Sequence, residues 1–98
     1  MLQTDDLFLG GYALTRGGEL VRVDLRGTNG RRVAVFTIAG PDIETAERDY
    51  YRGETAVDLR LLKLHIRRLK DQAFGALRNE EERDGAARSE GSRMYARR

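Results

Sequence analysis

Residues that could carry out chemistry are few and far apart in this chain of 98 residues. His65 is the single histidine and cysteine is absent, so no second imidazole or thiolate is present to complete a metal site or to activate a nucleophile. His65 falls at the edge of the apolar face of an expected helix, between Leu62 and Leu69, where a histidine usually has a structural role. The sequence therefore predicts a protein that is not an enzyme, with no catalytic residue, no metal and no cofactor.

The acidic and glycine-rich segments support the same prediction. Asp5 and Asp6 stand where a helix is expected to begin, and carboxylates there compensate the helix dipole, which explains them better than a catalytic pair does. A phosphate-binding loop must follow a strand and open a helix, and none of the glycine-rich segments of this chain has that setting. An acidic site that only folding would assemble stays open as an alternative.

A cluster of basic residues in the expected C-terminal helix is the main indication of nucleic-acid binding. These cations could contact several phosphates, and Tyr51 could stack on a base. In the simpler interpretation, which we favour, lysine and arginine only solvate the polar face of an amphipathic helix, since the motif matches no module that reads a nucleic-acid groove. The candidate nucleic-acid-binding residues are Arg52, Arg60, Lys63, Arg67, Arg68 and Lys70.

Composition and charge describe a single globular domain. Hydrophobic residues make up 40% of the chain and charged residues 35%, with a formal net charge of +2, which is too small to indicate polyanion binding by itself. The N-terminus lacks the basic start and apolar stretch of a signal peptide, and the longest apolar runs are too short to span a membrane. Since cysteine is absent, a reducing compartment is natural, and we expect a cytoplasmic protein.

The segment 22–38 predicts a β-hairpin together with its register. Asn29-Gly30 is a strong hairpin signal because both residues accept the positive φ of a type I′ turn. Apolar and polar residues alternate on either side of this turn, so a shift by one residue would expose the whole apolar face. The predicted partners are Leu25 with Ala34, Val23 with Phe36, and Val21 with Ile38.

Three helices are expected around this hairpin. The first covers residues 5–16, with Thr4 as its N-cap and Gly17-Gly18 as its stop. It is apolar nearly all the way round, which is typical of a central, well-covered helix. Gly10-Gly11 in its middle indicates either the close approach of another backbone or tolerated sequence variation.

The second helix is expected to begin near Pro41 and to end at Gly53. Residues 54–57 follow as an extended segment or a brief third strand. Asp58 then caps the third and longest helix, over residues 59–78, whose apolar residues follow helical spacing. They are Leu62, Ile66, Leu69, Ala73 and Leu77, with Leu59 and Phe74 on the flank.

The expected order of elements is α-β-β-α-α. This is an α+β fold in which a two-stranded antiparallel hairpin packs against three helices. Residues 1–78 are predicted to form one compact domain. Residues 79–98 are predicted to be a polar tail that is frayed or disordered, since it has too few apolar residues to pack.

Four aliphatic residues have no evident partner within that domain. Leu61 and Leu64 point away from the apolar face of the third helix, and Val33 and Val35 lie on the outer face of the hairpin. Contiguous exposed apolar surface usually marks an interface, so we expect a homodimer, formed through the long helix or through back-to-back hairpins. In the alternative, the second helix covers these residues within one chain.

These observations favour a small non-enzymatic binding or accessory protein. It would act by protein–protein interaction, with a second copy or with another cytoplasmic protein. A nucleic-acid-binding module that uses the basic face of the C-terminal helix is the alternative.

Three segments resemble a family of small prokaryotic and phage domains of unknown function. They are the opening segment 4–17 (TDDLFLGGYALTRG), the hairpin segment 32–36 (RVAVF) and the segment 49–53 (DYYRG), which a basic helix follows. The chain departs from the family at Gly10-Gly11, where the family tends to have alanines. The resemblance implies a single compact unit with the boundaries given above, and it implies no activity.

Overall fold

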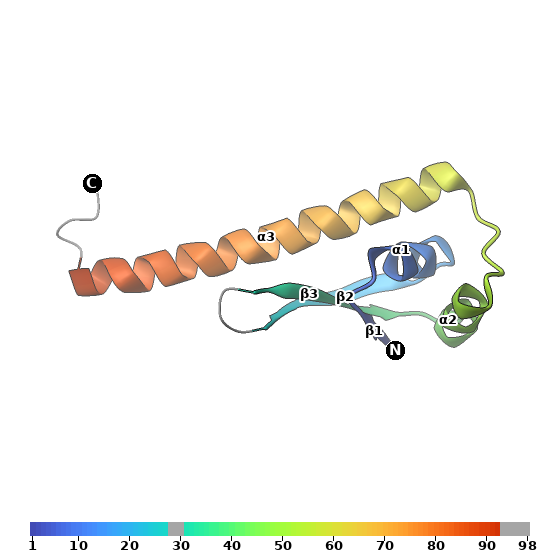
Figure 1. The fold of residues 1–98 in the computed structure, drawn as a ribbon, viewed down its shortest axis with the longest axis horizontal. Coiled ribbons are helices and arrows are strands. Elements are labelled where there is room, and N and C mark those ends of the chain that lie inside the picture. Colours follow the sequence, from blue (N-terminus) through green and yellow to red (C-terminus); the bar gives the residue numbers. More distant parts are fainter. Residues whose placement is uncertain (28–30, 93–98) are drawn as a thin grey trace.

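The computed structural model describes the backbone of residues 1–27 and 31–92, and the side chains of residues 1–27 and 31–81. Within these residues, three helices and three strands make the α+β fold that the sequence predicts. Helices α1 and α3 lie on one face of the sheet, and α2 lies at its end (Figure 1). The elements are β1 (Leu2–Thr4), α1 (Leu7–Thr15), β2 (Glu19–Arg26), β3 (Val33–Ala39), α2 (Ile43–Arg52) and α3 (Leu59–Ser92).

The sheet has three antiparallel strands in the order β1-β3-β2, instead of the predicted two. Thr4, the predicted N-cap, is the last residue of β1, and Asp6 caps α1 by accepting hydrogen bonds from the amides of Phe8 and Leu9. A strand of three residues gives little periodic signal, and pairing with a distant strand is what stabilises it. The alternative of a strand at 54–57 is wrong, because these residues form a loop.

The register of the hairpin agrees with the prediction near its turn and departs from it further away. Leu25 faces Ala34 and Val23 faces Phe36, as predicted. Ile38 faces Leu20 instead of Val21, because the register shifts between Leu20 and Arg22 and leaves Val21 as the extra, exposed residue. Such a β-bulge has no clear sequence signature. The turn at Asn29-Gly30 lies outside the described residues.

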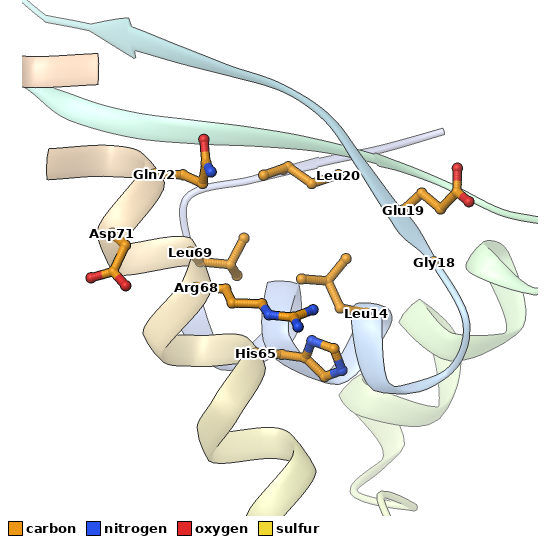
Figure 2. Close-up of a pocket in the computed structure, with 9 residues that line it drawn as sticks. All are labelled: Leu14, Gly18, Glu19, Leu20, His65, Arg68, Leu69, Asp71 and Gln72. Carbon is orange, nitrogen blue, oxygen red and sulfur yellow. The ribbon is translucent and has the colours of Figure 1, made fainter. Parts of the chain in front are cut away.

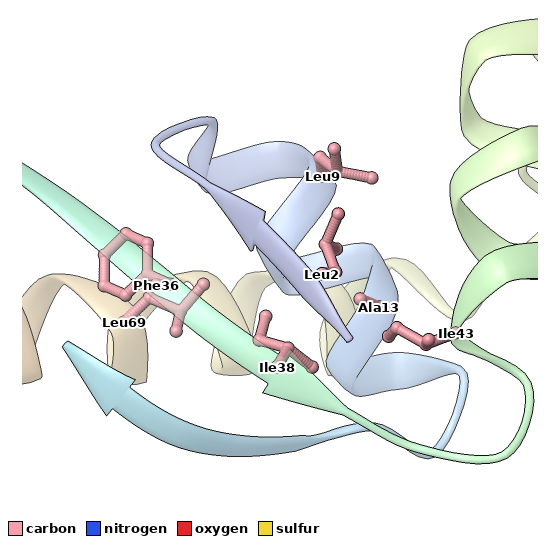
Figure 3. Packing of buried hydrophobic residues seen from close by; sticks show 7 residues of the cluster. All are labelled: Leu2, Leu9, Ala13, Phe36, Ile38, Ile43 and Leu69. Atoms are coloured by element: carbon pink, nitrogen blue, oxygen red, sulfur yellow. The ribbon is translucent and has the colours of Figure 1, made fainter.

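The core lies between the sheet, α1 and α3 (Figure 3). A Cβ added to Gly10 would lie 2.8 Å from Leu69 Cδ1, and one added to Gly11 would lie 2.7 Å from Ile66 Cγ1. Both distances are shorter than van der Waals contact, so α3 packs closely on Gly10-Gly11. The tightest contacts are with side chains of α3, and the nearest backbone atom is Ile66 N, 3.5 Å from a Cβ at Gly11. The buried residues of the cluster are Leu2, Leu9, Ala13, Phe36, Ile38, Ile43 and Leu69.

Polar contacts join α1 to α2. Arg16, at the end of α1, donates hydrogen bonds to Asp49 Oδ2 at 3.0 Å and to Asp42 Oδ2 at 2.6 Å. The hydrogen bond to Asp49 makes the largest of several contributions that raise the pKa of Arg16. The hydroxyl of Tyr50 donates to Asp6 Oδ2 at 2.9 Å, and burial together with this carboxylate raises the pKa of Tyr50. Two elements far apart in the sequence are therefore held in one orientation.

The predicted end of α2 at Gly53 and the predicted cap of α3 at Asp58 are confirmed. Gly53 closes α2 at φ 76°, and Asp58 Oδ1 accepts hydrogen bonds from the amides of Arg60 and Leu61 at 2.8 and 3.4 Å. Helix α3, however, continues to Ser92 instead of ending at Arg78. The polar segment 79–92 contains no proline and extends an existing helix, so it requires no new nucleation. The division into a domain 1–78 and a tail 79–98 stays a prediction.

Candidate functional site

Helix α3 packs on the rest of the chain with one face and leaves a hollow on each side of it. Leu69 at the centre of this face is fully buried. We call the hollow on the side of Phe8 and Phe74 the α3 groove, and the hollow on the side of His65 the His65 pocket. At about 100° per residue, His65 and Arg68 project from one side of the buried face of α3, and Lys63 and Phe74 project from the other side.

The α3 groove consists of two adjoining hollows of about 430 and 380 Å³, which share Lys70 and Phe74. Phe8 on α1 and Phe74 on α3 are both 62% exposed. Two exposed phenylalanines beside one hollow are unusual, because a large aromatic side chain is normally buried. The remaining residues that line the groove are Asp5, Leu7, Val33, Ala34, Phe36, Lys63, Ile66, Arg67, Asp71 and Ala73.

Basic residues occupy the α3 side of this groove. Lys63, Arg67 and Lys70 follow one another at spacings of four and three residues, which places them on the same side of the helix. None of them forms an ion pair within 4.0 Å in the part of the chain that the structure describes. The groove therefore combines an apolar floor with a cationic rim, a combination that suits a partner carrying both apolar and acidic groups.

The His65 pocket is a hollow of about 470 Å³ between α3, the end of α1 and the start of β2 (Figure 2). The Nδ1 atom of His65 is buried and has no hydrogen-bond partner among the described residues. Burial, with a smaller contribution from the positive charge of Arg68, lowers the pKa of His65 from 6.5. His65 is thus half-buried, and its lowered pKa favours the neutral imidazole. The structural role expected for it stays a prediction.

The predicted interface residues do not form one surface. Leu61 and Leu64 are 45% and 43% exposed and lie on the side of α3 away from the groove. Val33 is also exposed, but it lines the α3 groove. Val35 is half-buried and points to the opposite face of the sheet from Ala34. Helix α2 therefore leaves Leu61, Leu64 and Val33 uncovered, contrary to the alternative in which it buries them.

The predicted nucleic-acid-binding residues also separate. Lys63, Arg67 and Lys70 lie together in the α3 groove, whereas Arg68 lines the His65 pocket. Arg60 is exposed near the start of α3, and Arg52 is exposed at the end of α2. Folding thus brings three of the six cations into one site.

Sequence reasoning missed Phe8 as a surface residue. The apolar pattern of the first helix predicts cover on all sides, yet α1 packs against α3, the sheet and α2 and still leaves Phe8 open. The signal that could have located the groove is the spacing of Lys63, Arg67, Lys70 and Phe74, which share one side of α3. No helix-by-helix pattern could show that Phe8 lies beside them, because that depends on how α1 crosses α3.

The described residues contain no group of three or more histidine or acidic side chains placed to hold a metal ion. In the same residues, no helix combines the length and the apolar character that crossing a bilayer requires. No protein-family model matches the chain, and no curated protein or solved structure matches it either.

Proposed function

We propose that the protein acts by binding protein rather than by catalysis, and that two copies associate through the first turns of α3. The observation that supports this proposal is the distribution of leucine on that segment. Leu59, Leu61 and Leu64 are 60%, 45% and 43% exposed, while Leu62 between them packs inward. A helix that is apolar all round is normally buried on all sides, and here only one side is covered.

The contact proposed for the second copy is formed by Leu61 and Leu64. An antiparallel pairing of two α3 helices about a two-fold axis would bring these leucines together. The resemblance of the chain to small prokaryotic and phage domains stays a prediction and implies no activity.

The size of the effect follows from the exposure of the two leucines. Full burial of a leucine contributes roughly 1.5–3 kcal/mol, so covering the exposed 45% and 43% contributes about 1 kcal/mol for each side chain. Four such side chains in a symmetric pair contribute about 4 kcal/mol, which corresponds to about a thousandfold in the dissociation constant of the dimer.

Molar mass from light scattering, over a series of protein concentrations, tests this proposal. The wild-type chain is expected to have twice the mass of one chain, and the double variant Leu61→Glu, Leu64→Glu the mass of one. Leu59→Glu is the matched control, because Leu59 is an even more exposed leucine of the same segment but lies on the other side of α3 by helical spacing. A wild-type monomer, or a double variant that still dimerises, would remove the proposed contact.

A second candidate function is nucleic-acid binding in the α3 groove. The observation that favours it is that Lys63, Arg67 and Lys70 line the same hollow as the exposed Phe8 and Phe74. Cations that meet phosphates, combined with aromatic rings that stack on bases, are the usual means of holding single strands.

Fluorescence anisotropy of a labelled oligo-dT strand tests the second function. Binding through the groove should weaken steeply with salt, and Lys70→Gln should reduce the slope of log K against log salt by about 1. Arg52→Gln, at a distance from the groove, should leave the slope unchanged. If the strand does not bind at low salt, this function is excluded.

A further inference from the structure

Strand β3 has one edge that is only partly paired. On one side, β2 faces it from Val33 to Ala39. On the other side, β1 faces it only along Phe36, Thr37 and Ile38, because the chain leaves the sheet after Thr4 to form α1. Within the described residues, the edge of β3 at 33–35 therefore has no neighbouring strand.

The free edges of the sheet differ in how they are protected. The outer edge of β1 is only three residues long, and such short edge strands discourage pairing. The outer edge of β2 carries the charged residues Arg22, Asp24 and Arg26 and a register shift at Val21. Charges and bulges are the features that discourage a further strand from pairing with an edge. The free edge of β3 consists of valine and alanine only. It is therefore the edge of this sheet that is open to strand addition.

An apolar hollow lies directly beside this edge. It has a volume of about 380 Å³ and is lined mainly by Leu7, Ala34, Phe36, Ala73 and Phe74. The small side chains of Ala34 and Ala73 leave the space open. Since facing residues of an antiparallel pair point to the same side of a sheet, a residue opposite Ala34 would continue the row of Leu2 and Thr4. Its side chain would enter the hollow.

We propose that an extended segment of a partner protein adds to β3 at residues 33–35 as a fourth strand. The segment places one large apolar side chain opposite Ala34, in the hollow, and acidic side chains beside Lys70 and Arg67. We expect an acidic partner because the residues lining the groove include three cations, Lys63, Arg67 and Lys70, and only two carboxylates, those of Asp5 and Asp71. Main-chain hydrogen bonds supply affinity and the hollow supplies specificity, as in other cases of strand addition.

This inference does not depend on self-association, because it uses the opposite side of α3 from Leu61 and Leu64. An extended peptide fits the site better than a nucleic acid does, since a free strand edge offers main-chain donors and acceptors in the spacing of another polypeptide strand. The hollow of about 380 Å³ beside β3 is also mostly apolar, so an apolar side chain fits it better than a phosphate group does.

The test uses the full-length protein and a displayed library of short random peptides. Enriched peptides are expected to share one large apolar residue with aspartate or glutamate around it. Synthetic copies, labelled for fluorescence anisotropy, should bind Lys70→Glu at least about tenfold more weakly. Ala73→Phe, which fills the hollow, should reduce binding at least as much. Leu61→Glu is the control, and it should leave the affinity unchanged.

Backbone methylation of the peptide distinguishes a strand from a helix. N-methyl groups at alternate residues should abolish binding while those at the residues between are tolerated, because only every second amide of an added strand faces β3. Amide exchange at Val33, Ala34 or Val35 should slow when the peptide is bound. Since Lys70 is exposed, Lys70→Glu keeps the test valid even if Ala73→Phe fails to fold.

Several outcomes would overturn the inference. The inference is wrong if the library yields no peptide that binds the wild type better than it binds Lys70→Glu. It is also wrong if the enriched peptides bind as helices, so that methylation at any position weakens them. Displacement of the peptide by oligo-dT, with no change in exchange along 33–35, would assign the groove to nucleic acid instead. Loss of peptide binding in Leu61→Glu would mean that self-association, and not a free edge, creates the site.

Discussion

The contact between α1 and α3 gives the sharpest test of the fold, because one substitution is expected to have opposite effects at two glycines. Gly11→Ala adds a Cβ at 2.7 Å from Ile66 Cγ1 and 3.3 Å from Leu62 Cδ1. Gly75→Ala adds a Cβ with nothing within 4 Å. Both glycines lie inside helices, so both changes gain the same helix propensity.

The magnitudes can be worked out from these distances. Alanine in place of glycine stabilises a helix interior by about 1 kcal/mol, which is the whole effect expected at Gly75. At Gly11 the same gain is set against overpacking, which costs about 1–3 kcal/mol. Ile66 Cγ1 is attached directly to a branched Cβ, so it moves away only with the backbone or by leaving the one χ1 rotamer that isoleucine strongly prefers in a helix. We therefore expect Gly11→Ala to lower the free energy of unfolding by about 1 kcal/mol and Gly75→Ala to raise it by about as much.

Urea unfolding at a fixed protein concentration measures both changes, and the concentration is held constant because self-association would add to the apparent stability. With a slope of about 1–1.5 kcal/mol per molar urea, a difference of about 2 kcal/mol separates the two midpoints by more than about 1 M. A Gly11→Ala variant that is as stable as Gly75→Ala would show that α1 and α3 do not approach as described.

Three further predictions concern charged and titratable groups. Arg16→Met should lower the urea midpoint more than Arg22→Met does, because Arg16 joins two helices through two carboxylates, whereas the ion pair of Arg22 lies within one exposed strand. Burial and a neighbouring carboxylate raise the pKa of Tyr50 above 10.0. The resulting contribution to stability is present below pH 10 and is lost as the pH rises through the folded-state pKa. In urea titrations at a series of pH values, Tyr50→Phe should reduce this loss of stability at alkaline pH. The pKa of His65 is lowered from 6.5 by burial and by Arg68, so stability should fall as the pH drops below 6.5, and NMR titration should show Arg68→Gln moving the His65 pKa upward.

Sequence patterns predicted the parts of this fold that local interactions determine. The pairing of Leu25 with Ala34 follows from a turn signal and an alternation that lie within a few residues of each other. The cap at Asp58 and the stop at Gly53 are equally local, since each depends on hydrogen bonds or a φ angle of adjacent residues. These features were predicted correctly because their physical causes are contained in short segments.

The features that depend on distant contacts were not accessible in the same way. β1 exists because Leu2 pairs with Ile38, and the bulge at Val21 allows Leu20 to face the same residue. Neither has a signal in its own segment. The α3 groove likewise forms only when α1 crosses α3 at Gly10-Gly11 and brings Phe8 beside the basic side of α3. The exposure of Leu61 and Leu64 was predictable, because their helical phase differs from that of the buried face.

The length of α3 affects how this protein behaves in solution. Its 34 residues, at 1.5 Å each, form a rod of about 50 Å, and the part of the chain that the structure describes measures 57 × 24 × 21 Å. So elongated a particle meets more friction than a sphere of equal mass and elutes early from a sizing column. A single copy would then be mistaken for a pair, and only scattered light or sedimentation equilibrium, which weigh the particle independently of its outline, can tell one from the other.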